Sequence, residues 1–154
     1  MKKTFYAFAI IALTATAFTS CSSDDVEPTT VTIDSAQPNG TFTASANGDF
    51  VEENGSGSDG SAALGTDTDG TQFIEFSSDF TTNFATGTVT VYLSTSDTYT
   101  ADPGSGNPDL ILVGPIKSGG KSYLKVDPTA ASKFTHVILW CGSANVPFGN
   151  AELK

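Results

Sequence analysis

Residues 88–94 read TVTVYLS and give the clearest indication of the fold. The apolar residues Val89, Val91 and Leu93 alternate with threonines and a tyrosine. Successive side chains of a β-strand point to opposite faces of the sheet, so these three residues share one face. We therefore expect a strand over Thr88–Ser94 whose Val89 face lies in the protein core.

Stretches of the same kind recur along the chain, separated by Gly, Asp and Asn at the spacing typical of a β-sandwich or barrel. The other expected strands are Val31–Ile33, Thr41–Ala46, Asp49–Glu53, Ser61–Gly65, Thr71–Phe76, Leu110–Val113, Lys121–Val126, Thr135–Cys141 and Asn150–Leu153. Charged residues make up only 16% of the chain, and small polar residues are frequent, which favours strands and turns over long helices. The expected fold is all-β: a single antiparallel β-sandwich or barrel-like domain with at most one short helix.

A turn is expected at Asp69-Gly70, between two of these strands. Gly accepts the positive φ that tight hairpin turns require, so the pair predicts a hairpin. Asp67 and Asp69 also resemble the start of a calcium loop. No third spaced ligand precedes them, and Glu75 stands at the wrong offset for an EF-hand, so we favour the hairpin.

The one expected helix follows Asp127-Pro128. Asp is a favoured N-cap residue, and Pro is tolerated at the first helical position because no donor is needed there. The pair therefore predicts one or two helical turns over Thr129–Phe134, before the strand at Thr135–Cys141.

The N-terminus carries the pattern of a secreted protein. Lys2 and Lys3 precede an uncharged apolar stretch, which predicts a signal peptide at residues 1–20. Threonines and a serine dilute its second half, so it falls short of the roughly 18 apolar residues of a spanning helix. The segment ends in Phe18-Thr19-Ser20-Cys21, which resembles the lipobox of bacterial lipoproteins, with Phe18 where Leu is usual. The resemblance implies cleavage before Cys21 and lipidation of its sulfur.

Lipidation of Cys21 would tether the protein to a membrane, because several acyl chains hold a protein stably where one binds only marginally. Residues 21–39 are then the lipidated Cys and an acidic tether, and residues 40–154 are the β domain. An acidic run such as Asp24, Asp25 and Glu27 resembles the export signal that some Gram-negative bacteria place after the lipidated Cys. We expect an outer-membrane lipoprotein at the cell surface; a periplasm-facing lipoprotein is the alternative.

Charge and motif content exclude several functions. The formal charge is −10 and the chain has no Arg, so a surface that neutralises nucleic-acid phosphates is not expected. No Gly-x-Ser-x-Gly elbow is present, so hydrolase chemistry has no support and the enzyme class stays open. His136 is the only His, so neither a tetrahedral zinc site nor a blue-copper centre can be assembled. We expect no metal and no cofactor.

The most informative block is Phe134–Leu153, in which a hydrophobic strand ends in Trp140-Cys141 and is followed by Val146-Pro147-Phe148-Gly149. With the strand at Val89–Ser94 and the segment Leu112–Lys117, it resembles the DM-thirteen (DM13) domain, an all-β extracellular module also found in the Skeletor proteins. The resemblance runs from about Gly40 to Leu153. It implies structural roles for Trp140, Val146, Phe148 and Gly149, and electron transfer through the single Cys141.

The residues around Cys141 leave two interpretations open. In a buried strand end a thiol behaves as a small hydrophobe with a raised pKa. Against this, every Lys beyond the signal peptide lies from Lys117 onward, and a positive environment would favour the thiolate. Trp140 precedes Cys141, so it should point to the opposite face, where we expect it to anchor the core rather than relay electrons.

The expected function is a lipid-anchored envelope module that carries out redox or electron-transfer chemistry through Cys141 with a protein partner. If Cys21 is lipidated, Cys141 has no intramolecular disulfide partner. The alternative is a non-catalytic surface module that binds glycan or protein. An accessible Cys141 flanked by lysines would favour redox chemistry, whereas exposed aromatic residues beside acidic loops would favour surface binding.

Overall fold

The computed structural model describes residues 37–100 and 106–154. The expected signal peptide, the lipidation site Cys21, most of the acidic tether and the expected strand Val31–Ile33 lie outside the described residues. What the sequence predicts for those segments stays a prediction.

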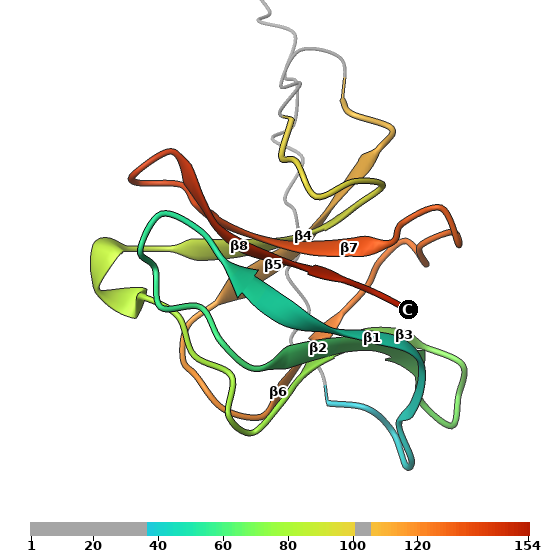
Figure 1. Cartoon of the computed structure of the whole chain (residues 1–154). Coiled ribbons are helices and arrows are strands. Elements are labelled where there is room, and N and C mark those ends of the chain that lie inside the picture. The colour runs from blue at the N-terminus through green and yellow to red at the C-terminus, as the bar shows by residue number, and fades with distance from the viewer. Residues whose placement is uncertain (1–36, 101–105) are drawn as a thin grey trace, which may run out of the picture. The chain divides into compact units, whose positions relative to one another are not determined.

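The described residues form eight β-strands and one short 3-10 helix, which confirms the all-β class (Figure 1). The helix, η1, spans Phe84–Thr86. The strands are β1 (Thr43–Glu52), β2 (Ser61–Thr66), β3 (Gln72–Phe76), β4 (Val89–Ser94), β5 (Leu110–Ile116), β6 (Ser122–Lys125), β7 (His136–Cys141) and β8 (Val146–Glu152).

The strands form one antiparallel sheet in the order β5-β4-β7-β8-β1-β2-β3-β6. The long strand β1 joins the two halves, since its first part pairs with β2 and its end pairs with β8. The edge strands β5 and β6 follow one another in the chain and also lie close to each other. The sheet therefore curls into a nearly closed barrel, and we call the gap between β5 and β6 the seam (Figure 1).

The core lies inside this curled sheet, as the alternation in residues 88–94 predicts. Val89, Val91 and Leu93 are fully buried. On the other half of the barrel, Phe76 and Phe80 pack with ring centroids 4.6 Å apart, and Phe50 contacts both rings. Apolar burial of this kind is the main favourable contribution to folding.

The hairpin expected at Asp69-Gly70 is confirmed and connects β2 to β3. Gly70 has a φ of 81°, and its N–H donates to the carbonyl of Asp67 at 3.1 Å. The Asp67 carboxylate accepts hydrogen bonds from the backbone N–H groups of Asp69 and Thr71 within the turn, and from that of Asn39. The Asp67 side chain therefore closes the hairpin and also fixes the chain that leads into β1.

Two expected strands, Thr41–Ala46 and Asp49–Glu53, form the single strand β1. Gly48 lies inside β1, at a point where the backbone of β8 comes so close that a side chain would not fit. A Cβ at Gly48 would stand 2.1 Å from the carbonyl oxygen of Glu152. A register shift between Ala44 and Ala46 marks a bulge in the pairing with β2.

The helix expected over Thr129–Phe134 is wrong, because this segment is irregular, with a turn at Ser132 and Lys133. The N–H of Ala130 donates to Oε1 of Gln72 on β3 at 2.7 Å, and Ala130 and Phe134 are buried in the core. A six-residue helix makes too few internal hydrogen bonds to offset its nucleation, so contacts with the sheet decide the conformation. Among the described residues the one helix is instead η1, where Oδ1 of Asn83 accepts the N–H of Ala85.

Candidate functional site

Cys141 is the last residue of β7, and its side chain belongs to the hydrophobic core. Its neighbours across the sheet are Val89 on β4 and Val146 on β8. The residue has 0% of its surface exposed, and it is a free cysteine. The turn that follows, residues 142–145, is closed by a 2.8 Å hydrogen bond from the N–H of Asn145 to the Cys141 carbonyl. The thiol thus lies at the end of a buried strand, directly beneath a turn.

Two hydroxyl groups lie against the sulfur of Cys141. Oγ1 of Thr86, at the end of η1, is 3.5 Å from Sγ, and Oγ of Ser143, in the turn, is 3.3 Å away. The Ser143 hydroxyl also donates to the backbone carbonyl of Thr86. We call this pair the Thr86–Ser143 latch, because it joins η1 to the turn over the thiol.

Gly87 allows the latch to close. A Cβ at this position would stand 2.8 Å from Oγ of Ser143. Gly87 also has a φ of 119°, which side chains other than hydrogen rarely tolerate. A glycine after η1 is therefore required by both the close contact and the backbone conformation.

The surroundings of Cys141 act on its pKa in opposite directions. Burial raises the pKa of the thiol, but the hydroxyls of Ser143 and Thr86 and the backbone N–H groups of Ala144 and Ser143 together hold the pKa below its ordinary value of 9.0. The latch and the turn therefore favour the thiolate through hydrogen bonds.

The sequence leaves open whether the lysines from Lys117 onward converge on Cys141. Three lysines form ion pairs elsewhere: Lys121 with Glu75 at 2.9 Å, Lys133 with Asp109 at 3.0 Å and Lys154 with Glu152 at 2.8 Å. Their ammonium groups are held by neighbouring carboxylates.

The motif residues after Cys141 build the adjacent strand. Val146 packs against the core, and Phe148 is buried within it with 4% of its surface exposed. Gly149 lets β1 approach, since a Cβ there would stand 2.7 Å from the carbonyl oxygen of Val51. Trp140-Cys141 and Val146–Gly149 therefore meet as paired segments of β7 and β8.

Residues 49–153 match the family described as Electron transfer DM13. The chain belongs to this DM13 electron-transfer family. No curated protein and no solved structure matches the chain. The match spans β1 to β8, so the latch, Cys141 and both motif segments lie within the DM13 domain. Within the described residues, the DM13 domain contains no helix with the length and apolar character to cross a bilayer.

Trp140 of the DM13 domain points away from Cys141, but it does not anchor the core as expected. It lies on the outer face, partly exposed, and stacks on Tyr99 with ring centroids 3.9 Å apart. Tyr92 on β4 contacts Tyr99 edge to face, with ring centroids 5.0 Å apart. Tyr99 and Trp140 line a pocket of about 460 Å³ that is also lined by Glu53 and Asp97.

The sequence did not single out Tyr92 and Tyr99. Tyr92 could have been recognised, because it pairs diagonally with the Trp140 region on the outer face of β4 and β7. Tyr99 could not, because it lies in an irregular loop whose path follows no periodic pattern. Burial and a hydrogen bond with Tyr99 both raise the pKa of Tyr92 above its ordinary value of 10.0.

His136 opens β7, where Nδ1 lies 3.0 Å from Oγ1 of Thr135. It adjoins a shallow pocket shared with Asp49, Asp97 and Glu152. Among residues 37–100 and 106–154, no three His, Cys, Asp or Glu side chains cluster closely enough to hold a metal ion.

Proposed function

We propose that Cys141 is the redox-active group of this DM13 domain and that it acts as a single thiol with a protein partner. The observation that carries the proposal is the set of hydroxyl and N–H groups around Sγ, which lowers the pKa of the thiol. The thiolate is the reactive form of cysteine, so a lowered pKa increases the reactive fraction at neutral pH. Membership of an electron-transfer family supports the same role.

The hydroxyls of the latch can act as hydrogen-bond acceptors or donors to Cys141, as its sulfur loses or regains a proton. While Cys141 is a thiol, its S–H can donate to Oγ of Ser143 as the Ser143 hydroxyl donates to the Thr86 carbonyl. After deprotonation, the Ser143 and Thr86 hydroxyls can turn to donate to the sulfur. The sulfur then has a hydrogen-bond partner in both protonation states, as a donor when it is a thiol and as an acceptor when it is a thiolate.

The proposed reaction is a two-electron exchange at sulfur. The Cys141 thiolate attacks a peroxide oxygen, the S–O bond forms, the O–O bond breaks and the leaving hydroxide takes up a proton to give water. A partner thiol then attacks the sulfenic acid, giving a mixed disulfide and a second water. A second thiol of the partner attacks the mixed disulfide and releases Cys141, so the partner dithiol is oxidised and the peroxide reduced. Because Cys141 is buried, the latch must open before either reagent reaches the sulfur.

We also propose that the DM13 domain works at the bacterial envelope, held by lipid on Cys21. The lipobox-like block before Cys21 and the acidic residues after it support an outer-membrane lipoprotein at the cell surface. The same block supports anchoring if the protein faces the periplasm. In either orientation, a redox partner must reach the domain at the membrane surface.

The test of the thiol role is alkylation of the folded lipoprotein at neutral pH, compared with the denatured protein and with Cys141→Ser. We expect slow but measurable labelling of the folded protein, and a sulfenic acid that dimedone traps under mild peroxide and a thiol reductant reverses. If Cys141 labels only after denaturation and never forms a reversible oxidised species, the proposal is wrong. Cys141→Ser then acts only on stability, lowering it by about 1–3 kcal/mol for a poorly paired buried hydroxyl.

A second function, glycan binding at the surface, is favoured by the Tyr92–Tyr99–Trp140 group. Aromatic faces beside carboxylate and amide groups stack on sugar rings and bind their hydroxyls, and the adjoining pocket offers Glu53, Asp97 and Asn150. Trp140 is the only Trp, so its fluorescence reports directly on this pocket. Titration with maltohexaose, cellohexaose and chitohexaose should give a saturable emission change that Tyr99→Ala abolishes and Tyr123→Ala preserves. No change at millimolar sugar excludes this function for these glycans.

A further inference from the structure

A pocket of about 230 Å³ lies between η1 and the end of β5. Its lining comes from η1 and the two residues after it and from the end of β5 and the residue after it: Phe84, Gly87, Thr88, Pro115, Ile116 and Lys117. Most of this lining is apolar. The pocket is smaller than the roughly 300–1,000 Å³ usual for drug-sized ligands, so it suits a molecule of few heavy atoms.

The pocket adjoins the cover of Cys141. Gly87 lines the pocket and is also the residue whose Cβ would collide with Ser143 of the latch. Ile116 on β5 and Cys141 on β7 both pair with Val89 on β4, so two strand spacings, about 10 Å, separate their backbones. A ligand in the pocket therefore lies beside the segment that must move before the sulfur can be reached.

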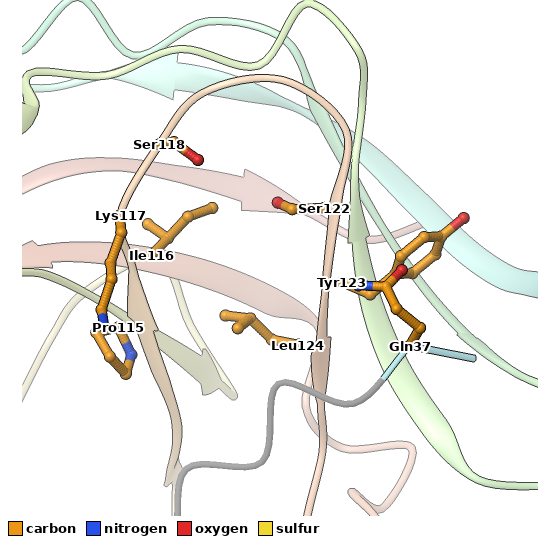
Figure 2. A pocket seen from close by; sticks show the side chains of 8 residues that line it. All are labelled: Gln37, Pro115, Ile116, Lys117, Ser118, Ser122, Tyr123 and Leu124. Atoms are coloured by element: carbon orange, nitrogen blue, oxygen red, sulfur yellow. The ribbon is translucent and has the colours of Figure 1, made fainter. Parts of the chain in front are cut away.

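Lys117 gives the pocket a positive charge without a counter-ion. It is exposed and makes no ion pair with any residue that the structure describes, in contrast to the three paired lysines. Its side chain runs toward Pro115, and it also lines the neighbouring pocket of about 420 Å³ in the seam (Figure 2). No described carboxylate lines either of these pockets, whereas Glu53 and Asp97 line the pocket at Trp140. In this acidic protein, the pocket beside the latch is therefore suited to an anion.

We propose that this pocket binds a small disulfide that carries a carboxylate and delivers it to Cys141. The inference rests on the thiol role proposed above and names an oxidant other than peroxide for it. The apolar walls at Phe84 and Ile116 suit polarizable sulfur and methylene groups, and Lys117 suits the carboxylate. A peroxide gains little from this pocket, because it is small, polar and uncharged.

The delivered disulfide reacts by thiol–disulfide exchange once the latch is open. The Cys141 thiolate attacks one sulfur of the ligand, a new S–S bond forms, the S–S bond of the ligand breaks, and the leaving thiolate takes up a proton. A partner dithiol then attacks the mixed disulfide and closes its own disulfide, which releases the second small thiol and regenerates Cys141. The partner dithiol is oxidised, and the small disulfide is reduced to two thiols.

The first measurement is binding of a probe that cannot react, thiodiglycolate, a thioether with two carboxylates. It is titrated at fixed ionic strength into the isotope-labelled mature protein, and amide shifts are followed by NMR. We expect saturable shifts at Gly87, Thr88 and Lys117, and weaker binding of the neutral analogue thiodiethanol. Lys117→Gln should weaken thiodiglycolate binding about two- to fivefold, as expected for one exposed ion pair.

The matched control is Lys154→Gln, which removes the same single positive charge. Lys154 pairs with Glu152, and Glu152 lies opposite His136, at the other end of β7 from Cys141. This variant should bind thiodiglycolate as the unsubstituted protein does.

The second measurement is delivery to the sulfur. Dithiodiglycolate, hydroxyethyl disulfide and cystamine are disulfides of similar size that carry negative, no and positive charge, and mass spectrometry follows the mixed disulfide that each forms with Cys141. Lys117→Gln should lower the ratio of the dithiodiglycolate rate to the hydroxyethyl disulfide rate about two- to fivefold, and should not lower the ratio for cystamine. Lys154→Gln should leave both ratios unchanged. Taking ratios removes any effect of the substitution on opening of the latch.

The outcomes separate this inference from the thiol role of Cys141. The inference is wrong if thiodiglycolate shifts no amide at the pocket, or if Lys117→Gln and Lys154→Gln change the rate ratio equally. It is also wrong if Cys141 forms a sulfenic acid but no mixed disulfide, and in these cases the thiol role stands on its own test. If Cys141 reacts with no reagent at all, the thiol role is refuted and this inference with it.

Discussion

Replacing Ser143 with alanine should make Cys141 more accessible and raise its pKa. Ser143→Ala removes the hydrogen bond to the Thr86 carbonyl and the hydroxyl that lies 3.3 Å from Sγ. The side chain of Ser143 lies at an exposed position, so alanine leaves no buried cavity and creates no clash. The substitution therefore changes the latch and little else.

The magnitude follows from the loss of the hydrogen bond between Ser143 and the Thr86 carbonyl. An intramolecular hydrogen bond contributes about 0.5–1.5 kcal/mol net. If the latch must open before alkylation, removing this bond increases the open population, and the labelling rate, between about twofold and thirteenfold. Because Ser143 is exposed, we expect a value near the middle of that range, about fivefold at 1 kcal/mol.

The assay is the alkylation rate of Cys141 as a function of pH, with a small neutral reagent in excess. In a protein that is mostly closed, the pH midpoint of the rate reports the pKa of the closed thiol, and the plateau at high pH reports opening of the thiolate form. Ser143 lowers the pKa of Cys141, so Ser143→Ala should move the midpoint upward and raise the plateau. Both changes have the same cause, since the closed thiolate loses a donor.

The matched control is Ser96→Ala. Ser96 also donates from an exposed hydroxyl to a loop carbonyl, that of Thr98 at 3.4 Å, but it follows the other end of β4, about 17 Å along the strand from the Val89–Cys141 pair. It should leave both the midpoint and the plateau unchanged. An unchanged plateau in Ser143→Ala, or a midpoint that moves down, refutes the latch as the gate of the thiol.

Three further outcomes are expected. Cys21→Ser should move the protein from the membrane to the soluble fraction on cell fractionation, and retention of the variant in membranes would contradict lipid anchoring. Asp67→Asn should lower the urea midpoint at pH 7, because hydrogen bonds from the backbone N–H of Asn39 and from those of Thr71, Asp69 and Gly70 hold the pKa of Asp67 below its ordinary 3.8. The stabilisation by the Asp67 carboxylate is complete above pH 3.8 and is lost as the pH falls through the lowered pKa. The difference in urea midpoint between Asp67→Asn and the unsubstituted protein should therefore shrink at acid pH. A difference that does not depend on pH would contradict this role of the carboxylate. Gly48→Ala should lower the free energy of unfolding by about 1–3 kcal/mol through the clash with Glu152, whereas Gly142→Ala, whose Cβ meets nothing within 4 Å, should have little effect; equal urea midpoints would show that β8 shifts without loss.

The strands could be predicted from the sequence because their side-chain alternation is itself a consequence of burial on one face. Val89, Val91 and Leu93 are the clearest example, and the structure buries all three. Strand boundaries were harder to predict where the close approach of a neighbouring backbone, and not the pattern of side chains, decides whether the strand continues. Gly48 is compatible with a turn as well as a strand, and only the Glu152 backbone across the sheet shows why it lies in β1.

The site was harder to predict than the fold, because its contacts join residues far apart in the sequence. Thr86 and Ser143 are 57 positions apart, and neither belongs to a recognisable motif. The lysines illustrate the same difficulty: their clustering in sequence left their partners open, and the folded sheet pairs Lys121 with Glu75 and Lys133 with Asp109. The interpretation of Asp127-Pro128 as a helix start was wrong, since the side chain of Gln72 on β3 binds the backbone N–H of Ala130 in an irregular segment.

A buried thiol is compatible with a redox role in an oxidising compartment. Oxidation of cysteine depends on thiolate character and on exposure, so an exposed thiolate in the envelope would be oxidised by any available reagent. Cys141 combines a lowered pKa with complete burial, which keeps the reactive form while denying access to the closed protein. Access then depends on η1 and the turn at residues 142–145, both of which are short, lie at the surface and are joined over the sulfur by the Thr86–Ser143 latch. Under the proposed function, a partner that binds this turn would open the latch, and selectivity among reagents would arise from the cover of the thiol.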